Sequence, residues 1–165
     1  MPENDLLDSS YYRPLFQLMH SLDQDIERLY TSRGKSVRSR SVGPLISLSR
    51  FGPMTVKDLA IDREVSHSAM SQTISGLTRD GLVRLDPGDD ARTRVVSLTP
   101  AGEEIAPLVR AEWRATESVL RALDDEIAQP LMRAVEDLKA ALEKKPFHER
   151  LEEALEQRLK TGAEQ

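Results

Sequence analysis

The fold is decided by residues 55–74, TVKDLAIDREVSHSAMSQTI. Thr55 and Ser66 each precede an apolar helical pattern, and a side-chain hydroxyl at such a position accepts a hydrogen bond from an unpaired N–H group of the first turn. We therefore predict a short helix over 56–61 and a second helix from His67 to about Arg79. Two helices joined by so short a turn are typical of a helix-turn-helix.

The residues that follow predict a β-hairpin. Leu82-Val83-Arg84-Leu85 alternates, Asp86-Pro87-Gly88-Asp89-Asp90 is a strong turn sequence, and Val95-Val96-Ser97-Leu98 is a second short strand. A hairpin directly after a helix-turn-helix makes a winged helix.

Helical patterns flank this centre on both sides. Upstream, apolar residues at helical spacing predict a helix around 15–29, a Ser-rich loop over 36–41, and a short helix from Pro44, placed in its first turn, to Arg50. Downstream, Thr99-Pro100 begins a long helix that continues to Leu123. A further helix from Asp124 is interrupted early by Pro130, and a last helix begins at Pro146.

The apolar stripes of the outer helices are more than a small winged-helix core can cover, so they require partner helices and favour a homodimer. The predicted fold is mainly α with a small β-hairpin wing: a winged helix-turn-helix plus long dimerisation helices. We assign residues 1–40 to an N-terminal dimerisation helix and basic loop. Residues 41–99 form the DNA-binding domain, and residues 100–165 form the C-terminal dimerisation helices.

The net charge of −5 hides an uneven distribution. Lys and Arg number 23 in the chain against 28 Asp and Glu, yet basic residues exceed acidic ones over 33–99, and both flanks are acidic. A basic centre is the electrostatic mark of a polyanion-binding surface, although a solvated loop has the same composition. The chain has no Cys, which excludes disulfides, Cys-ligated metals and thiol sensing. The acidic N-terminus and the lack of a long apolar run predict a cytoplasmic protein that does not enter membranes.

Four stretches together resemble the MarR family of bacterial transcription regulators. They are residues 52–60, residues 65–74 with the Gly81-Leu82-Val83 that follows, Asp90-Ala91-Arg92, and residues 96–102. The resemblance covers about residues 41–105, and the flanking helices agree in pattern only. It implies a homodimeric DNA-binding repressor or activator that binds a pseudo-palindromic operator and is often tuned by a small aromatic or phenolic effector.

The exposed face of the second helix is the candidate reading surface. Its residues are small or polar, and none is a long acid, which suits close approach to a major groove better than an ordinary solvated face does. Thr55 stands at the start of the preceding helix, where a phosphate would be contacted. The candidate contacts here are Thr55, His67, Ser68, Ser71, Gln72 and Ser75.

In the wing, Arg92 and Arg94 follow the turn. The family resemblance implies that Arg92 enters the minor groove and that Asp90 supports the wing; narrow minor grooves favour Arg. Weaker candidates for phosphate contacts are Lys57, Arg79 and Arg84. The basic loop of Arg33, Lys35, Arg38 and Arg40 either touches phosphates or is solvated, and the sequence leaves both open.

The family resemblance also implies an effector pocket where the long helices meet the winged helix. The candidates by position are Met19, His20, Tyr30, Arg50 and Trp113, each of which is equally well explained as core or rim. The three histidines have no metal-binding spacing, and there is no catalytic triad, phosphate loop or dinucleotide fingerprint. No cofactor and no metal are expected, and the chain is not predicted to be an enzyme.

The sequence thus predicts a sequence-specific, DNA-binding transcriptional regulator, with a ligand-responsive repressor as the favoured form. The alternative is a winged-helix module that binds another protein and no longer touches DNA. A polar recognition face together with Arg92 favours the first. Operator, regulated genes, effector and sign of regulation are not encoded in these patterns.

Overall fold

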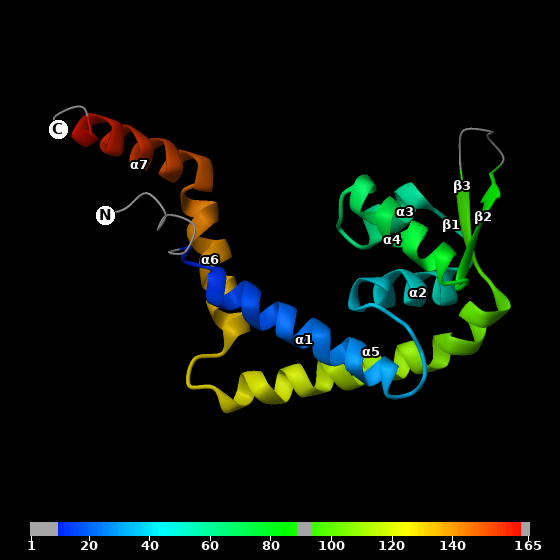
Figure 1. The fold of residues 1–165 in the computed structure, drawn as a ribbon. Helices are drawn as coiled ribbons and strands as arrows, with labels where there is room; N and C mark the ends of the chain where they lie inside the picture. The colour runs from blue at the N-terminus through cyan, green and yellow to red at the C-terminus, as the bar shows by residue number, and fades with distance from the viewer. Residues whose placement is uncertain (1–9, 89–93, 163–165) are drawn as a thin grey trace. The chain divides into compact units, whose positions relative to one another are not determined.

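A computed structural model describes residues 10–88 and 94–162 of the chain (Figure 1). The described residues fall into two compact units, divided between Trp113 and Arg114. In chain order the elements are α1 (Arg13–Thr31), α2 (Ser39–Phe51), β1 (Met54–Thr55), α3 (Val56–Asp62), α4 (His67–Arg79), β2 (Val83–Pro87), β3 (Arg94–Leu98), α5 (Pro100–Glu126), α6 (Leu131–Lys144) and α7 (Phe147–Gly162).

The helix-turn-helix is formed by α3 and α4, with the predicted caps. The Thr55 hydroxyl accepts a hydrogen bond from the Asp58 N–H at 3.0 Å and donates one to the Asp58 carboxylate at 2.7 Å. The Ser66 hydroxyl accepts from the Ala69 N–H at 3.2 Å, and α4 runs from His67 to Arg79 as expected. Glu64, in the turn, has a φ of 52°, a left-handed conformation that lets the chain reverse within four residues.

The wing is part of a three-stranded antiparallel sheet with the order β1-β3-β2. β2 pairs with β3 as expected, with Leu85 opposite Val96. The sequence did not predict β1, in which Met54 lies opposite Val96 on the other side of β3. A strand of two residues has no periodicity to detect, and β1 forms only because β3 offers it a free edge.

The core of unit 1 lies between α2, α3, α4, the sheet and the first turns of α5. Its fully buried side chains come from all of these elements and from the end of α1: Tyr30, Leu45, Leu59, Ile74, Leu77, Val83, Val96 and Val109. The Tyr30 hydroxyl donates a hydrogen bond of 3.0 Å to Glu112, which is only 5% exposed. This bond ties the end of α1 to α5 inside the core.

A tight joint connects the end of α4 to the start of α5. The Thr99 hydroxyl donates to the Gly81 carbonyl at 2.6 Å and accepts from the Gly102 N–H at 3.1 Å, while the Thr99 N–H donates to the Leu82 carbonyl at 3.1 Å. A Cβ on Gly102 would lie 2.1 Å from the Leu82 carbonyl oxygen, so only glycine fits there. The predicted cap at Thr99-Pro100 is confirmed.

The prediction for α2 was wrong at its start. The helix begins at Ser39, inside the expected Ser-rich loop, and Pro44 lies in its interior. Residues 41–45 are all buried, so extending the helix backwards buries Val42 and Leu45 together, and this burial offsets the hydrogen bond that Pro44 cannot donate.

Unit 2 consists of α5 from Arg114 onward, α6 and α7. The expected new helix at Asp124 was wrong: Asp124 belongs to α5, which ends at Glu126, and α6 begins after Pro130, because a residue that precedes proline avoids the helical conformation. The Asp124 carboxylate accepts the Leu131 N–H at 2.6 Å. None of the described residues from Arg114 onward is buried, although α6 and α7 carry the apolar stripes that the sequence predicts.

Among the described residues, no helix is both long and apolar enough to cross a membrane. Nor do the side chains of that part of the chain include a group of three or more His, Cys, Asp and Glu residues arranged to hold a metal ion.

Candidate nucleic-acid interface

The candidate reading surface is the exposed face of α4. All five of its candidate residues are exposed: His67, Ser68, Ser71, Gln72 and Ser75. The opposite face packs on the core through Met70, Ile74 and Leu77, each no more than 2% exposed. Val65, in the turn just before α4, is 44% exposed.

Some polar groups of this face are occupied by neighbours and others are not. The Ser75 hydroxyl donates to the Ser71 carbonyl at 2.8 Å, and the Ser66 and Ser68 hydroxyls share a hydrogen bond of 3.1 Å. Within the described part of the chain, neither the Gln72 amide nor the His67 ring has a partner. These two side chains therefore present complete hydrogen-bonding edges to the outside.

An open hollow of about 610 Å³ lies beside this face, between the start of α3, α4 and the wing. It brings together five of the predicted contacts from three elements: Thr55, His67, Ser71, Ser75 and Arg94. Ser68 and Gln72 are outside it, farther around α4. Arg92 and Asp90, the contacts that the family resemblance implies for the wing tip, lie outside the described residues.

The hollow also has lining residues that sequence reasoning ranked low or missed. Lys57, a weak candidate from sequence, is exposed and lines it. Leu85 was expected to be an ordinary strand residue, yet it is 40% exposed and forms part of the wall. Strand alternation could not have identified Leu85, because Val83 and Leu85 lie on the same face of β2 and Val83 is buried.

An acidic residue of the wing disfavours DNA binding unless its charge is paired. Asp86 is paired: it accepts from Arg84 Nε at 2.9 Å and from the Ser97 hydroxyl at 3.5 Å. Besides its ion pair with Asp86, Arg84 donates a hydrogen bond of 3.3 Å from Nη1 to the Leu98 carbonyl. It is therefore less available for phosphate than Arg94, which lies opposite Pro87 on the neighbouring strand and is exposed.

The four residues of the predicted basic loop divide into two parts, and the last of them, Arg40, lies in the first turn of α2. Arg33 donates to the Leu29 carbonyl at 3.1 Å, and Lys35 forms an ion pair of 3.2 Å with Glu104 on α5. Arg38 and Arg40 have no partner among the described residues. The loop is therefore neither wholly solvated nor wholly available to a ligand.

The structure does not gather the five effector candidates around one of its described hollows. Met19 and His20 are exposed on α1, where His20 shares a hydrogen bond of 3.0 Å with Gln24. Tyr30 is a core residue, and the Arg50 guanidinium lies over the Phe51 ring at 4.9 Å. Trp113 is 38% exposed, with the Arg63 guanidinium 5.7 Å from its ring centre.

A helix-turn-helix followed by a hairpin, with long helices on both sides, defines the chain as a winged-helix protein. Among solved structures this is the fold of MarR-family regulators, so the predicted fold class is confirmed. The sequence itself matches no protein-family model, and no curated protein matches it.

Three solved structures illustrate the likeness. The transcriptional regulator MosR of M. tuberculosis, in complex with DNA, aligns with a TM-score of 0.60 at 20% identity over 82% of this chain and 98% of that chain. MepR of S. aureus, in a DNA complex, gives 0.58 at 19% identity over 82% and 94%. A MarR protein from Peptoclostridium difficile gives 0.58 at 18% identity over 90% and 95%. Nearly the whole length of each of these three proteins aligns with this chain. The shared fold therefore includes helices outside the winged helix.

Proposed function

We propose that this chain is a MarR-family transcriptional regulator that binds a pseudo-palindromic DNA operator as a homodimer. One observation carries the proposal: the small polar face of α4 stands beside a hollow whose walls include Lys57 and Arg94. The fold likeness to regulators solved with DNA supports it.

The chemistry of the face suits direct reading of bases. Its short side chains allow the α4 backbone to enter a major groove, and the unpartnered Gln72 amide can pair with both hydrogen-bonding groups of an adenine. Lys57 and Arg94 then neutralise phosphates at the groove edge. By the family resemblance, Arg92 adds a minor-groove contact and Asp90 supports the wing.

The dimer is proposed from unit 2. None of the described residues of unit 2 is buried, and its exposed large apolar side chains are those that a partner would cover. They are Val119, Leu120, Leu123, Ile127, Leu131, Met132, Leu138, Leu142, Phe147, Leu151, Leu155 and Leu159. Sedimentation equilibrium at micromolar concentration should give a dimer, and a monomer at that concentration would refute this part.

Selection of bound duplexes from a random pool tests the central claim. We expect enrichment of an inverted repeat whose half-sites are about one helical turn apart, because two α4 helices of a dimer enter successive major grooves. Arg92→Ala should weaken binding to the recovered duplex with the fold intact. Recovery of no sequence, with no binding to any duplex at low salt, would overturn the proposal in favour of a protein-interaction module.

The proposal extends to repression and to a small aromatic or phenolic effector, which the family resemblance supports. Trp113 is the chain's single tryptophan and is partly exposed, so its fluorescence reports on ligands near α5. Phenol and benzoate serve as probes, added to the protein with and without the recovered duplex. A fluorescence change coupled to DNA release supports the effector, and no change at millimolar probe counts against it.

A further inference from the structure

Most basic side chains in the described part of unit 1 already have partners. Arg28 pairs with Asp25, Lys35 with Glu104 and Arg84 with Asp86, while Arg50 and Arg63 lie over aromatic rings. Those with no ion pair, hydrogen bond or ring contact among the described residues are Arg38, Arg40, Lys57, Arg79 and Arg94. All of these except Arg40 lie alongside α4.

Two of the unpaired cations meet over Gly76. Arg79 Nη2 lies 3.7 Å, and Arg38 Nη1 4.0 Å, from the position that a Cβ on Gly76 would take. The two nitrogens are therefore at most about 8 Å apart, which is close enough for both guanidinium groups to contact one phosphate. The two guanidinium groups, one from the residue that precedes α2 and one from α4, converge here, and neither forms an ion pair with a described carboxylate.

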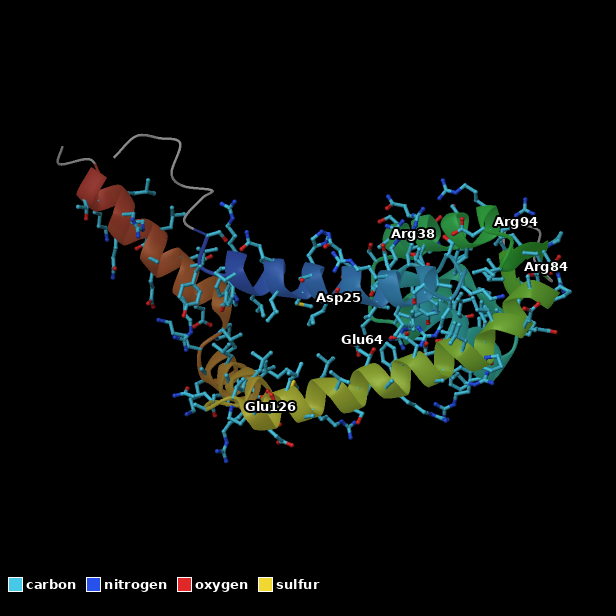
Figure 2. The ribbon with its side chains drawn as sticks, turned by 60° about the horizontal axis from the view of Figure 1, so that its bottom comes forward. Asp25, Arg38, Glu64, Arg84, Arg94 and Glu126 are labelled. Carbon is cyan, nitrogen blue, oxygen red and sulfur yellow. The ribbon has the colours of Figure 1, made fainter. Side chains whose placement is uncertain are left out.

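This pair lies on the flank of α4 opposite the hollow. At about 100° per residue, Gly76 is half a turn around the helix from His67, and Gln72 is between them on the exposed side. Lys57 and Arg94 thus line one flank of the reading face, and Arg38 and Arg79 the other. Figure 2 shows Arg38 and Arg94 along one edge of unit 1, with Glu64 away from that edge.

A helix in a major groove has a phosphate backbone on each side, about 12 Å apart. Cations on both flanks of α4 match that arrangement, whereas a single patch would match one strand only.

We propose that Arg38 and Arg79 form a phosphate clamp that holds one backbone strand, while the hollow faces the other. This inference rests on the proposed DNA-binding function and assigns Arg38, at the start of α2, a direct role in it.

The test compares Arg38→Gln, Arg79→Gln and their double variant by fluorescence anisotropy of full-length protein. Arg33→Gln is the matched control, because Arg33 belongs to the same basic loop but its guanidinium is turned onto α1. Each protein is titrated with the selected duplex and with a scrambled duplex between about 50 and 200 mM salt. Each phosphate contact contributes about 0.9 to the slope of log affinity against log salt.

Each single substitution leaves one guanidinium on the phosphate and should reduce that slope only in part. A dimer carries the clamp twice, so the double variant should reduce the slope by nearly 2. The loss of affinity over this salt range then becomes about tenfold smaller than for the wild type. Affinity for both duplexes should fall in the same ratio, since a phosphate contact carries no sequence information. Arg33→Gln should keep the wild-type slope.

Unchanged slopes in Arg38→Gln and Arg79→Gln, with a wild type that binds DNA, would overturn the clamp and leave the proposed function standing. Loss of affinity for the selected duplex alone would also overturn it, because that indicates base reading. A wild type that binds no duplex refutes both. A final arm titrates inorganic phosphate and follows the Gly76 amide by NMR: a saturable shift that both substitutions abolish, with DNA slopes unaffected, would assign the pair to a free anion instead.

Discussion

The Tyr30 hydroxyl lies 3.0 Å from the Glu112 carboxylate, to which it donates a hydrogen bond between residues 82 positions apart in the chain. Both side chains are buried, and no solvent competes for the contact. Burial, and then the neighbouring charge of Glu112, raise the pKa of the Tyr30 phenol well above its ordinary value. Tyr30 therefore remains a donor throughout the neutral range and fixes the last turn of α1 against α5.

Removing that donor should destabilise the fold. Tyr30→Phe keeps the ring but leaves the buried Glu112 carboxylate with one partner fewer, which costs about 1–3 kcal/mol of unfolding free energy. Urea unfolding followed by circular dichroism measures the change. Tyr11→Phe is the control, since Tyr11 is 88% exposed, and it should have no effect. Equal stability of Tyr30→Phe and wild type would show that the bond contributes nothing.

Stability should also fall in alkaline solution for the same reason. The unfolded chain ionises Tyr30 near pH 10.0, whereas the folded chain holds the proton to higher pH, so the unfolded state binds fewer protons once pH exceeds 10.0. The contribution of Tyr30 is complete below that pH and is lost as pH rises. Unfolding free energies from pH 8 to pH 11 should decline more steeply for wild type than for Tyr30→Phe, and parallel curves would contradict this.

Two buried glycines in helices should respond to alanine in opposite directions. In Gly102→Ala the new methyl group collides with the Leu82 carbonyl oxygen, which is backbone and cannot turn away. We expect a loss of at least about 2 kcal/mol. In Gly76→Ala the nearest atoms are at ordinary contact distance, so helix propensity dominates and stability should rise by up to about 1 kcal/mol. Thermal unfolding of both variants checks the signs, and a stabilised Gly102→Ala would refute the joint.

Two substitutions should distinguish a side chain that reads bases from one that contacts phosphate. Gln72→Ala removes the amide that we propose reads a base. It should cost about 1–3 kcal/mol on the selected duplex, with relaxed preference at one position of each half-site. Arg94→Ala should weaken all duplexes alike and reduce the salt slope. Repeating the selection with each variant distinguishes them. An unaltered sequence preference in Gln72→Ala would remove it from the reading face.

The helix-turn-helix was predictable because its signals are local. Thr55, Ser66 and Thr99 are hydroxyl residues placed where a helix needs a cap, and each makes the expected bond. The wing strands were predicted by their alternation and by the turn between them. Most of the candidate reading face followed from the same reasoning, since its residues lie on one side of one helix.

What the sequence did not predict depends on distant partners. β1 exists because β3 has a free edge, and α2 begins early because its first turns are buried. The meeting of Arg38 with Arg79 joins two elements that are 41 positions apart, and neither residue has a local pattern that marks it. The Tyr30–Glu112 bond is likewise invisible in the sequence, where Glu112 resembles any surface acid.

The joint between α4 and α5 has a consequence for divergence. Most of its atoms belong to the backbone: the Leu82 carbonyl, the Thr99 N–H, the Gly81 carbonyl and the Gly102 N–H. The joint requires only two features of the sequence, which are the hydroxyl of Thr99 and the absence of a side chain at Gly102. Substitutions at other positions leave these two requirements unchanged. The joint therefore constrains the backbone at two sequence positions, in a chain that the three solved structures named above match in fold at 18% to 20% identity.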